Sequence, residues 1–139
     1  MTRVGFYVLQ STAPEARLEV AMRLTEKAFQ QGHRVYINAA NEAQATQLDE
    51  KLWHLRPASF LPHALQSDNT QEDIAIGWGQ EPSIQNGLLI NLQYSVPPFF
   101  SRFERVAEVV TQDAASLSAL RESWQFYRQR GYQLEKHDL

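Results

Sequence analysis

Short apolar runs alternate with longer stretches of helical periodicity over the first 55 residues of the chain. Residues 3–9 are rich in Val, Phe and Tyr and predict a strand. Apolar residues at helical spacing follow between Pro14 and Gly32 and predict a helix. Proline favours the first turn of a helix and glycine the position just after its end, so these two residues mark its limits. Residues 34–38 predict a second strand, and residues 42–53 predict a second helix.

The rest of the chain is less regular but carries the same two signals. Three short apolar runs each predict a further strand: residues 74–78, 88–92 and 106–110. Asp113 is the predicted cap of a final helix that ends near Gly131. Asn41 is the predicted cap of the earlier helix at residues 42–53. This interpretation leaves residues 132–139 as a short tail.

Strand and helix alternate at the start of the chain, which is typical of a right-handed βαβ unit on a parallel sheet. We therefore expect one α/β domain over residues 1–139, with a Rossmann-like, mostly parallel sheet of about five strands and helices on both faces. Many such sheets bind a nucleotide on a glycine-rich loop after the first strand. Residues 10–14 read Gln-Ser-Thr-Ala-Pro and contain no glycine, so no phosphate-binding loop is expected.

Composition narrows the class of protein. Hydrophobic residues make up 43% of the chain and charged residues 21%, which is enough to build a core. The formal net charge of -3 argues against a protein that grips the nucleic-acid backbone, because such domains usually carry a basic excess. The sequence has no cysteine, no signal-peptide pattern and no apolar run near the ~20 residues that cross a bilayer. We expect a soluble cytoplasmic protein without a membrane partner.

The sequence lacks the patterns that would support catalysis or metal binding. The four histidines are not spaced as metal ligands: His33, His54, His63 and His137. Asp49 and Glu50 are neighbours on a helix and point about 100° apart, which is typical of a solvated surface. We therefore expect no catalytic residue, no metal and no cofactor. The alternative is a nucleotide-binding α/β enzyme with a non-standard ligand loop, and direct DNA binding is a third hypothesis that the acidic charge disfavours.

Residues 53–63 form the first candidate interaction surface, because they are rich in aromatic residues and proline. The segment contains Trp53, Phe60, Pro62 and His63. One interpretation is that Trp53 and Phe60 close the core beneath a loop. The other is an exposed docking surface, since prolines hold an irregular segment stiff and lower the entropy cost of binding.

The last helix offers a second candidate surface. At 100° per residue, one stripe spans roughly 60° of the helix: Leu117, Arg121, Trp124 and Arg128. A broader face is the predicted core side: Ala119, Leu120, Phe126 and Tyr127. A tryptophan between two arginines suits a short acidic ligand with an aromatic end, because guanidinium groups bind carboxylates and the indole packs on a ring. Alternatively, Trp124 belongs to the core and the arginines extend past it.

Two specific sequence strings occur in the chain: Leu-Asp-Glu-Lys-Leu-Trp at residues 48–53 and Ser-Phe-Leu-Pro-His at residues 59–63. Together they resemble the bacterial DNA polymerase III chi subunit family. Weaker similarity to that family continues in order along nearly the whole chain, in residues 4–9, 32–37, 88–92, 97–100, 103–106 and 127–132.

The resemblance implies a non-catalytic accessory subunit in the clamp-loader complex of the replicative polymerase, with a nucleotide-binding fold that lacks its phosphate loop. In that family, chi pairs one-to-one with the psi subunit, which tethers it to the clamp loader. Chi also binds the acidic C-terminal tail of single-stranded-DNA-binding protein, which ends in Pro-Phe, so it reaches DNA only through partners. The resemblance assigns tail binding to Arg121, Trp124, Gln125 and Arg128, and psi binding to Trp53, Phe60, Pro62 and His63.

Overall fold

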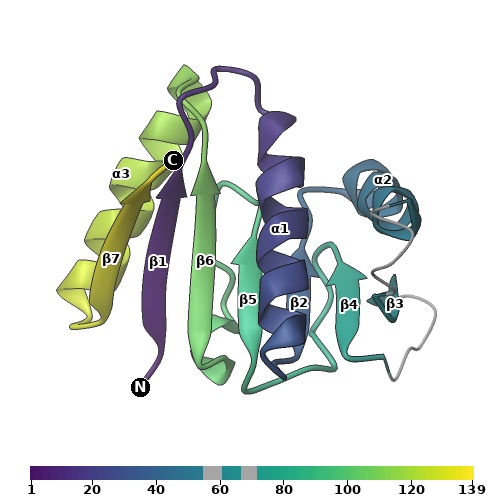
Figure 1. Cartoon of the computed structure of the whole chain (residues 1–139). Coiled ribbons are helices and arrows are strands. Elements are labelled where there is room, and N and C mark those ends of the chain that lie inside the picture. Colours follow the sequence, from purple (N-terminus) through teal and green to yellow (C-terminus); the bar gives the residue numbers. More distant parts are fainter. Residues whose placement is uncertain (55–60, 67–71) are drawn as a thin grey trace.

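The structure is a computed structural model and describes residues 1–54, 61–66 and 72–139. Its strands are β1 (Arg3–Val8), β2 (Val35–Asn38), β3 (His63–Leu65), β4 (Ile74–Gly77), β5 (Leu88–Asn91), β6 (Arg105–Val110) and β7 (Gln133–Asp138). Its helices are α1 (Ala16–Gln30), α2 (Glu42–Trp53) and α3 (Ala114–Gln129), and residues 100–102 form the 3₁₀ turn η2 (Phe100–Arg102). The strands are all parallel and form a single open sheet in the order β3-β4-β2-β5-β6-β1-β7 (Figure 1).

The direction in which the chain crosses the sheet decides which face each helix covers. From β1 to β2 and on to β3 the chain moves one way, and α1 and α2 pack into the same core. From β6 to β7 it moves the other way, past β1, and α3 lies on the opposite face (Figure 1). Right-handed crossovers require this division. The predicted parallel α/β sheet with helices on both faces is confirmed.

Alternate side chains of the central strands fill two hydrophobic cores, one on each face of the sheet. On the face of α1 and α2, Val35 and Ile37 of β2 are fully buried. On the face of α3, Val4 and Phe6 of β1 pack with Tyr127. Strands that are buried on both faces have continuous apolar sequences, which is why four-residue runs were sufficient to predict β4 and β5.

The helix ends follow the predicted capping residues. The side chain of Asn41 accepts a hydrogen bond from the backbone N–H three residues further on, at 2.8 Å, and starts α2. Asp113 does the same for α3 at 3.2 Å. Each such cap stabilises a helix by about 1 kcal/mol. Gly32 has a φ of 85° just past α1, a conformation that glycine adopts without the strain of a side chain.

The expected number of about five strands was too low, because two segments without an apolar run also form strands. Residues 63–65 form the short β3, directly after Pro62. Residues 133–138, which belong to the expected tail, form β7 and pair with β1 along its full length. An edge strand is only partly buried, so a polar sequence such as Gln-Leu-Glu-Lys-His-Asp can form one. Such a sequence gives no hydrophobic signal from which the strand could be predicted.

The buried face of α3 was predicted only in part. Tyr127 is fully buried, as expected. Three other expected core residues are only half-buried: Ala119, Leu120 and Phe126. Two small residues, Ser116 and Ser123, share the buried face with Tyr127 instead. Serine allows the helix to approach the sheet closely, and the Ser116 hydroxyl lies 2.9 Å from the hydroxyl of Thr111, so its polar group is satisfied.

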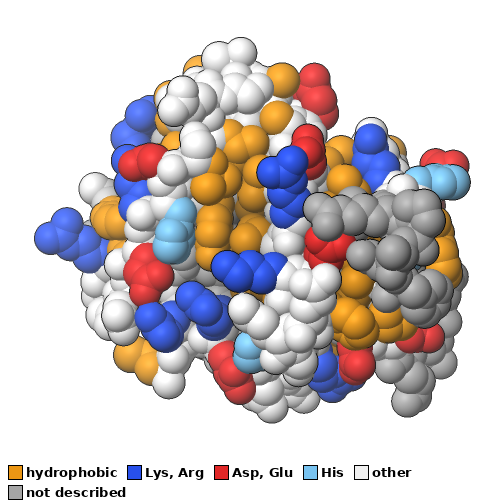
Figure 2. All heavy atoms as spheres, in the orientation of Figure 1, with side chains coloured by type: hydrophobic (Ala, Val, Ile, Leu, Met, Phe, Trp, Pro, Cys, Tyr) orange, Lys and Arg blue, Asp and Glu red, His pale blue; other side chains and the backbone are white. Residues whose placement is uncertain are grey.

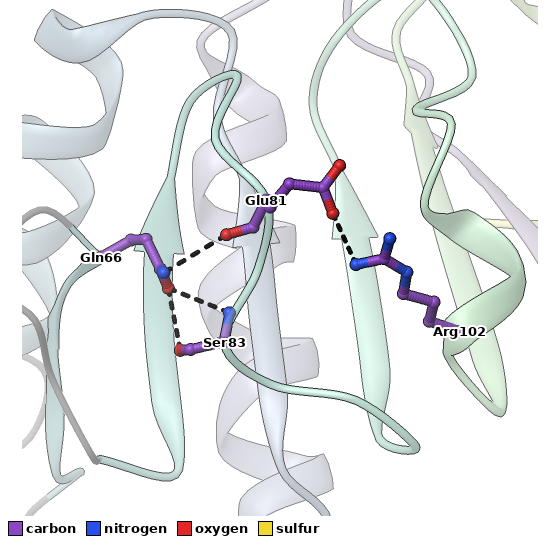
Figure 3. A network of polar contacts seen from close by, with 4 residues as sticks. All are labelled: Gln66, Glu81, Ser83 and Arg102. Atoms are coloured by element: carbon purple, nitrogen blue, oxygen red, sulfur yellow. Dashed lines mark hydrogen bonds and ion pairs between the residues drawn. The ribbon is translucent and has the colours of Figure 1, made fainter.

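Exposed polar contacts join the end of β3 to two later segments (Figure 3). The Gln66 side chain accepts a hydrogen bond from the Ser83 hydroxyl at 3.0 Å and donates to the Glu81 carbonyl oxygen at 3.4 Å. The Glu81 carboxylate in turn pairs with Arg102 of η2 at 2.5 Å. Each exposed contact contributes little to stability, but together they fix the loop after β4 against both neighbours.

Gly87 provides a test of the packing at the start of β5. A Cβ atom at this position would overlap the backbone carbonyl of Arg34. The same carbonyl accepts the Leu88 N–H at 2.8 Å, so the two segments cannot separate without losing that hydrogen bond. We expect Gly87→Ala to lower the free energy of unfolding by roughly 2–4 kcal/mol, measured by urea denaturation. In the control Gly5→Ala, the new Cβ meets side-chain atoms instead of backbone, the Tyr7 ring at 3.2 Å and the His137 ring at 3.7 Å. An equal loss in this variant would contradict the steric explanation.

Candidate interaction surfaces

The four residues assigned to tail binding lie together on one flank of α3, next to the face that packs on the sheet. Arg121, Gln125 and Arg128 are exposed, and Trp124 is half-buried. Residues three and four apart on a helix are neighbours, so Trp124 lies between the two arginines. The structure therefore presents one aromatic ring and two cations on a continuous surface, which we call the α3 surface.

Trp124 is held in place from one side. Its ring centroid lies 5.1 Å from that of Phe6, at an interplanar angle of 50°, and Phe6 is fully buried. The indole thus borders the core on the α3 face while part of it remains accessible. Trp124 is therefore partly a core residue and partly a surface residue, which were the two interpretations of the sequence. An aromatic ring that is already ordered loses little entropy when a ligand packs against it.

The cations of the α3 surface are not neutralised within the part of the chain that the structure describes. Neither Arg121 nor Arg128 forms an ion pair with a carboxylate there. Arg128 also lies in the last turn of α3. Arg130 lies on the other flank, with its guanidinium carbon 3.8 Å from the centre of the Phe126 ring. Two arginines beside an accessible ring can bind a carboxylate and an aromatic group together.

Trp53, at the end of α2, is an exposed residue of the candidate surface predicted in residues 53–63. Its side chain is 55% exposed, so it does not close the core. Its ring centroid lies 4.4 Å from that of His63, at 49°. Pro62 is half-buried next to His63, and the assigned residue Phe60 lies outside the described residues. We call Trp53 and Pro62, with His63 beneath the indole, the α2 surface.

His63 was assigned to a binding surface, but its side chain is fully buried. Its Nδ1 lies 2.6 Å from the Leu61 carbonyl oxygen, and its Nε2 lies 3.0 Å from the Asp49 carbonyl oxygen. The imidazole therefore links β3 to α2. Its role at this surface is to support the Trp53 ring from inside the protein.

Parallel α/β sheets bind ligands outside the carboxyl ends of their strands. Here side chains and backbone groups of the chain itself form hydrogen bonds at the carboxyl ends of the strands. The buried Arg17 donates from Nη1 to the Leu92 carbonyl oxygen at 2.9 Å and from Nε to that of Pro14 at 3.1 Å. The Ala16 N–H, at the start of α1, donates to the Ala13 carbonyl oxygen at 3.0 Å. In phosphate-binding loops the corresponding N–H groups point at the ligand.

A buried polar row, not predicted from the sequence, connects the sheet to α3. Asn38, Asn91 and Glu108 are in register across β2, β5 and β6. Asn38 donates to the Asn91 side chain at 3.0 Å, and Asn91 donates to Glu108 at 3.0 Å. The Tyr127 hydroxyl donates to the second Glu108 oxygen at 2.7 Å. The available signal was a glutamate in the middle of the apolar run Arg-Val-Ala-Glu-Val-Val.

Burial raises the pKa of Glu108 from its ordinary value of 4.5 to about 7. Hydrogen bonds from Tyr127 and Asn91 and the positive charge of Arg17 act in the opposite direction but do not overcome the loss of solvation. Burial and the Glu108 carboxylate also raise the pKa of the Tyr127 hydroxyl. Tyr127 therefore remains a hydrogen-bond donor to Glu108 at neutral pH.

Residues 1–54, 61–66 and 72–139 contain neither a metal-binding cluster nor a membrane-spanning helix. No three His, Asp or Glu side chains in these ranges come together as a group that could hold a metal ion. No helix in the same ranges has both the length and the apolar character needed to cross a bilayer.

The fold and its surfaces define a class of protein. It is a parallel α/β sheet in which groups of the chain itself form hydrogen bonds at the carboxyl ends of the strands, and it has accessible tryptophan and arginine side chains on α2 and α3. A family model described as DNA polymerase III chi subunit, HolC, matches residues 1–135. The chain belongs to this family, which is a family of DNA replication subunits.

Curated relatives match this chain over nearly its whole length. DNA polymerase III subunit chi of Pseudomonas aeruginosa is 46% identical over 139 residues, which are 100% of this chain and 98% of the relative. The Haemophilus influenzae subunit of the same name is 33% identical over 137 residues, 96% and 95% of the two chains. That of Escherichia coli is 28% identical over 141 residues, 96% of each. The family resemblance seen in the sequence is confirmed.

The raised pKa of Glu108 predicts a specific dependence of stability on pH. Between pH values of about 4.5 and 7 the unfolded chain loses this proton and the folded chain keeps it, so unfolding becomes easier as the pH rises through this window. The loss is on the order of 3 kcal/mol and is constant above the window. We expect Glu108→Gln to flatten this part of the profile, measured as unfolding free energy in urea from pH 5 to 7.5.

Glu104→Gln is the matched control, because it removes an exposed carboxylate from the residue directly before β6, and it should leave the slope unchanged. Equal slopes for the wild type and Glu108→Gln would show that Glu108 titrates as an ordinary carboxyl group.

Proposed function

We propose that this chain is a non-catalytic adaptor of DNA replication that links two other proteins. Through one surface it pairs one-to-one with the psi subunit, which attaches it to the clamp loader of DNA polymerase III. Through the other it captures the C-terminal tail of single-stranded-DNA-binding protein. It acts in the cytoplasm at the replication fork and contacts DNA only through these partners. Membership of the chi family supports the proposal.

The α3 surface is the observation that carries this proposal. A tail that is acidic and ends in Pro-Phe with a free carboxylate presents one aromatic ring and several negative charges. Trp124 offers a partly accessible ring, and Arg121 and Arg128 are exposed cations without an ion pair among the described residues. Guanidinium groups bind carboxylates with two parallel hydrogen bonds, so this surface suits the end of such a tail.

The α2 surface suits a different kind of contact. An exposed tryptophan costs stability in water and is typical of a binding hot spot when it is supported from below. Trp53 is 55% exposed and rests on the buried His63 ring. Because α2 and α3 lie on opposite faces of the sheet, psi and the tail can be bound at the same time.

The tail contact is small, so each one is weak, about micromolar. Single-stranded-DNA-binding protein on the lagging strand displays many tails close together, and the resulting high effective concentration strengthens attachment without any new contact. Added salt weakens the interaction, because the arginines are solvent-exposed.

Arg128→Ala tests the α3 surface. We expect the variant to bind a peptide ending in Pro-Phe with a free carboxylate about 1–3 kcal/mol more weakly, measured by calorimetry, because a charge-assisted hydrogen bond is lost. Arg130→Ala is the matched control, since it removes the same charge from the opposite flank of α3, where Arg130 packs on Phe126. The amidated peptide should bind the wild type as weakly as the free acid binds Arg128→Ala.

Unchanged affinity in Arg128→Ala would remove Arg128 from the site. A rise in melting temperature with ATP, GTP or NAD, and none with the tail peptide, would instead favour the nucleotide-binding enzyme.

Trp53→Ala tests the α2 surface. We expect the variant to fail to copurify with psi while keeping its affinity for the tail peptide, because Trp53 is exposed and its removal leaves the core intact. His54→Ala, at the neighbouring exposed position, should copurify normally. Loss of both psi and tail binding in Trp53→Ala, with a lower urea midpoint, would show general unfolding and would contradict the assignment.

A further inference from the structure

The edge strand β7 contributes side chains to the face of the sheet on which α3 lies. In the register of β1 and β7, Phe6 is level with Lys136, and Val4 is level with Leu134. Paired residues of neighbouring parallel strands point to the same face, and Val4, Phe6 and Leu134 all belong to the core beneath α3. Lys136 therefore projects from the sheet on the side of α3.

Lys136 lies close to the tryptophan of the α3 surface. The Trp124 ring centroid is 5.1 Å from that of Phe6, and Lys136 is the neighbour of Phe6 on the next strand, about 4.8 Å away in the direction of the hydrogen bonds. Phe6 is fully buried, whereas Lys136 is exposed. A lysine in this position packs its aliphatic chain along apolar surface and keeps its ammonium group in water.

Lys136 thus joins the arginines of α3 around the accessible part of Trp124. α3 runs antiparallel to β7, because it connects the end of β6 to the start of β7 and these strands are parallel. Arg121 therefore lies toward the end of β7, Arg128 lies toward its start, and Lys136 lies between them on the strand. Figure 2 shows Lys and Arg side chains along the side of the molecule that carries α3 and β7. We call Arg121, Trp124, Arg128, Leu134 and Lys136 the α3–β7 surface.

The α3–β7 surface carries a positive excess. On the same face of β7, Asp138 is the carboxylate side chain among the described residues, and it pairs with Lys136 at 3.5 Å. Glu122, the acidic residue of α3, lines a hollow with Phe126 on the other flank of the helix. The two arginines and Lys136 outnumber the acids even when Asp138 and the carboxyl group of Leu139 are both counted, on a chain whose net charge is -3.

The pair with Asp138 leaves Lys136 available to a ligand. The two side chains are 53% and 71% exposed, and their separation of 3.5 Å is longer than that of a strong charge-assisted hydrogen bond. Exposed pairs of this kind are weak, because water solvates both charges. A carboxylate on a ligand that also packs against Trp124 can therefore replace Asp138 as the partner of Lys136.

We propose that the tail-binding site extends from α3 onto β7, and that Lys136 binds an acidic side chain of the tail upstream of its terminal Pro-Phe. This inference rests on the proposed function and adds a binding residue to it. With the terminal ring on Trp124 and the terminal carboxylate at Arg128, the rest of the tail can leave across β7 or over α3. Charge decides between the two directions, because β7 offers Lys136 and the far flank of α3 carries Glu122.

The test compares Lys136→Gln with Lys27→Gln by calorimetry at low ionic strength, with an acidic peptide that ends in Pro-Phe. Both variants remove a positive charge, but Lys27 belongs to α1, which covers the other face of the sheet. We expect Lys136→Gln to bind the peptide about threefold more weakly, as for the loss of an exposed ion pair. Lys27→Gln should bind like the wild type. Asp138→Asn should bind about twofold more tightly, because it releases Lys136 and removes a repelling charge.

Two altered peptides separate the roles of the cations. One has its upstream acidic residues replaced by the corresponding amides, and the other has an amidated C-terminus. We expect Lys136→Gln to weaken binding of the amidated peptide and to leave binding of the upstream-neutral peptide unchanged. Arg128→Ala should show the reverse pattern. A general effect of net charge would change both peptides equally in both variants.

Equal affinities of Lys136→Gln and the wild type, or equal losses in Lys136→Gln and Lys27→Gln, would overturn this inference. If Arg128→Ala still weakened binding, the tail would bind α3 alone and the proposed function would stand. No binding of the peptide to the wild type would overturn both.

Amide shifts in the isotope-labelled wild type test the extension without any variant. We expect the peptide to shift the amides of Leu134 and Lys136 together with that of Trp124. Shifts confined to α3 would contradict the proposal. Shifts at Lys136 with oligo(dT) and none with the peptide would mean a nucleic-acid site and would overturn it.

Discussion

Every connection between neighbouring parallel strands must run right-handed over one face of the sheet, so the direction of travel determines where each helix lies. The chain moves one way from β1 to β3 and the other way from β6 to β7. As a result α1 and α2 share one core, and α3 packs on the second together with the turn η2. Phe100 of η2 packs against Phe126 on one flank of α3, and the other flank, with Trp124, Arg121 and Arg128, remains accessible. The same constraint leaves the front of β1 and β7 without a helix.

The polar row from Asn38 to Tyr127 determines how α3 sits on the sheet. A buried carboxyl group contributes less to stability than a well-packed apolar residue would, because its desolvation opposes its hydrogen bonds. It does impose a geometry, since the Tyr127 hydroxyl reaches Glu108 at 2.7 Å in only one rotation of the helix. Trp124 precedes Tyr127 by three residues, so this hydrogen bond also sets the direction in which the indole points. The core on the α3 face and the α3 surface are therefore mechanically linked.

Most of the fold could be predicted because its central elements carry strong local signals. Buried strands such as Val35–Asn38 have uninterrupted apolar sequences, and Asn41 and Asp113 mark helix starts through side-chain hydrogen bonds that depend on neighbouring residues only. The edge strand β7 gave no such signal, since its partner β1 lies at the other end of the chain. The burial of His63 and the row through Glu108 also depend on contacts between distant segments. The stripe on α3 followed from helix geometry alone, because it depends only on the spacing of residues along one helix.

The position of β1 has a consequence for the biosynthesis of the protein. This first strand pairs with β6 and β7, which follow it by about one hundred residues or more. During translation Val4, Phe6 and Val8 therefore emerge from the ribosome long before either neighbouring strand exists. The nascent chain therefore carries an unpaired apolar strand at least until β6 has been synthesised, and the loop that β1 and β6 close is long.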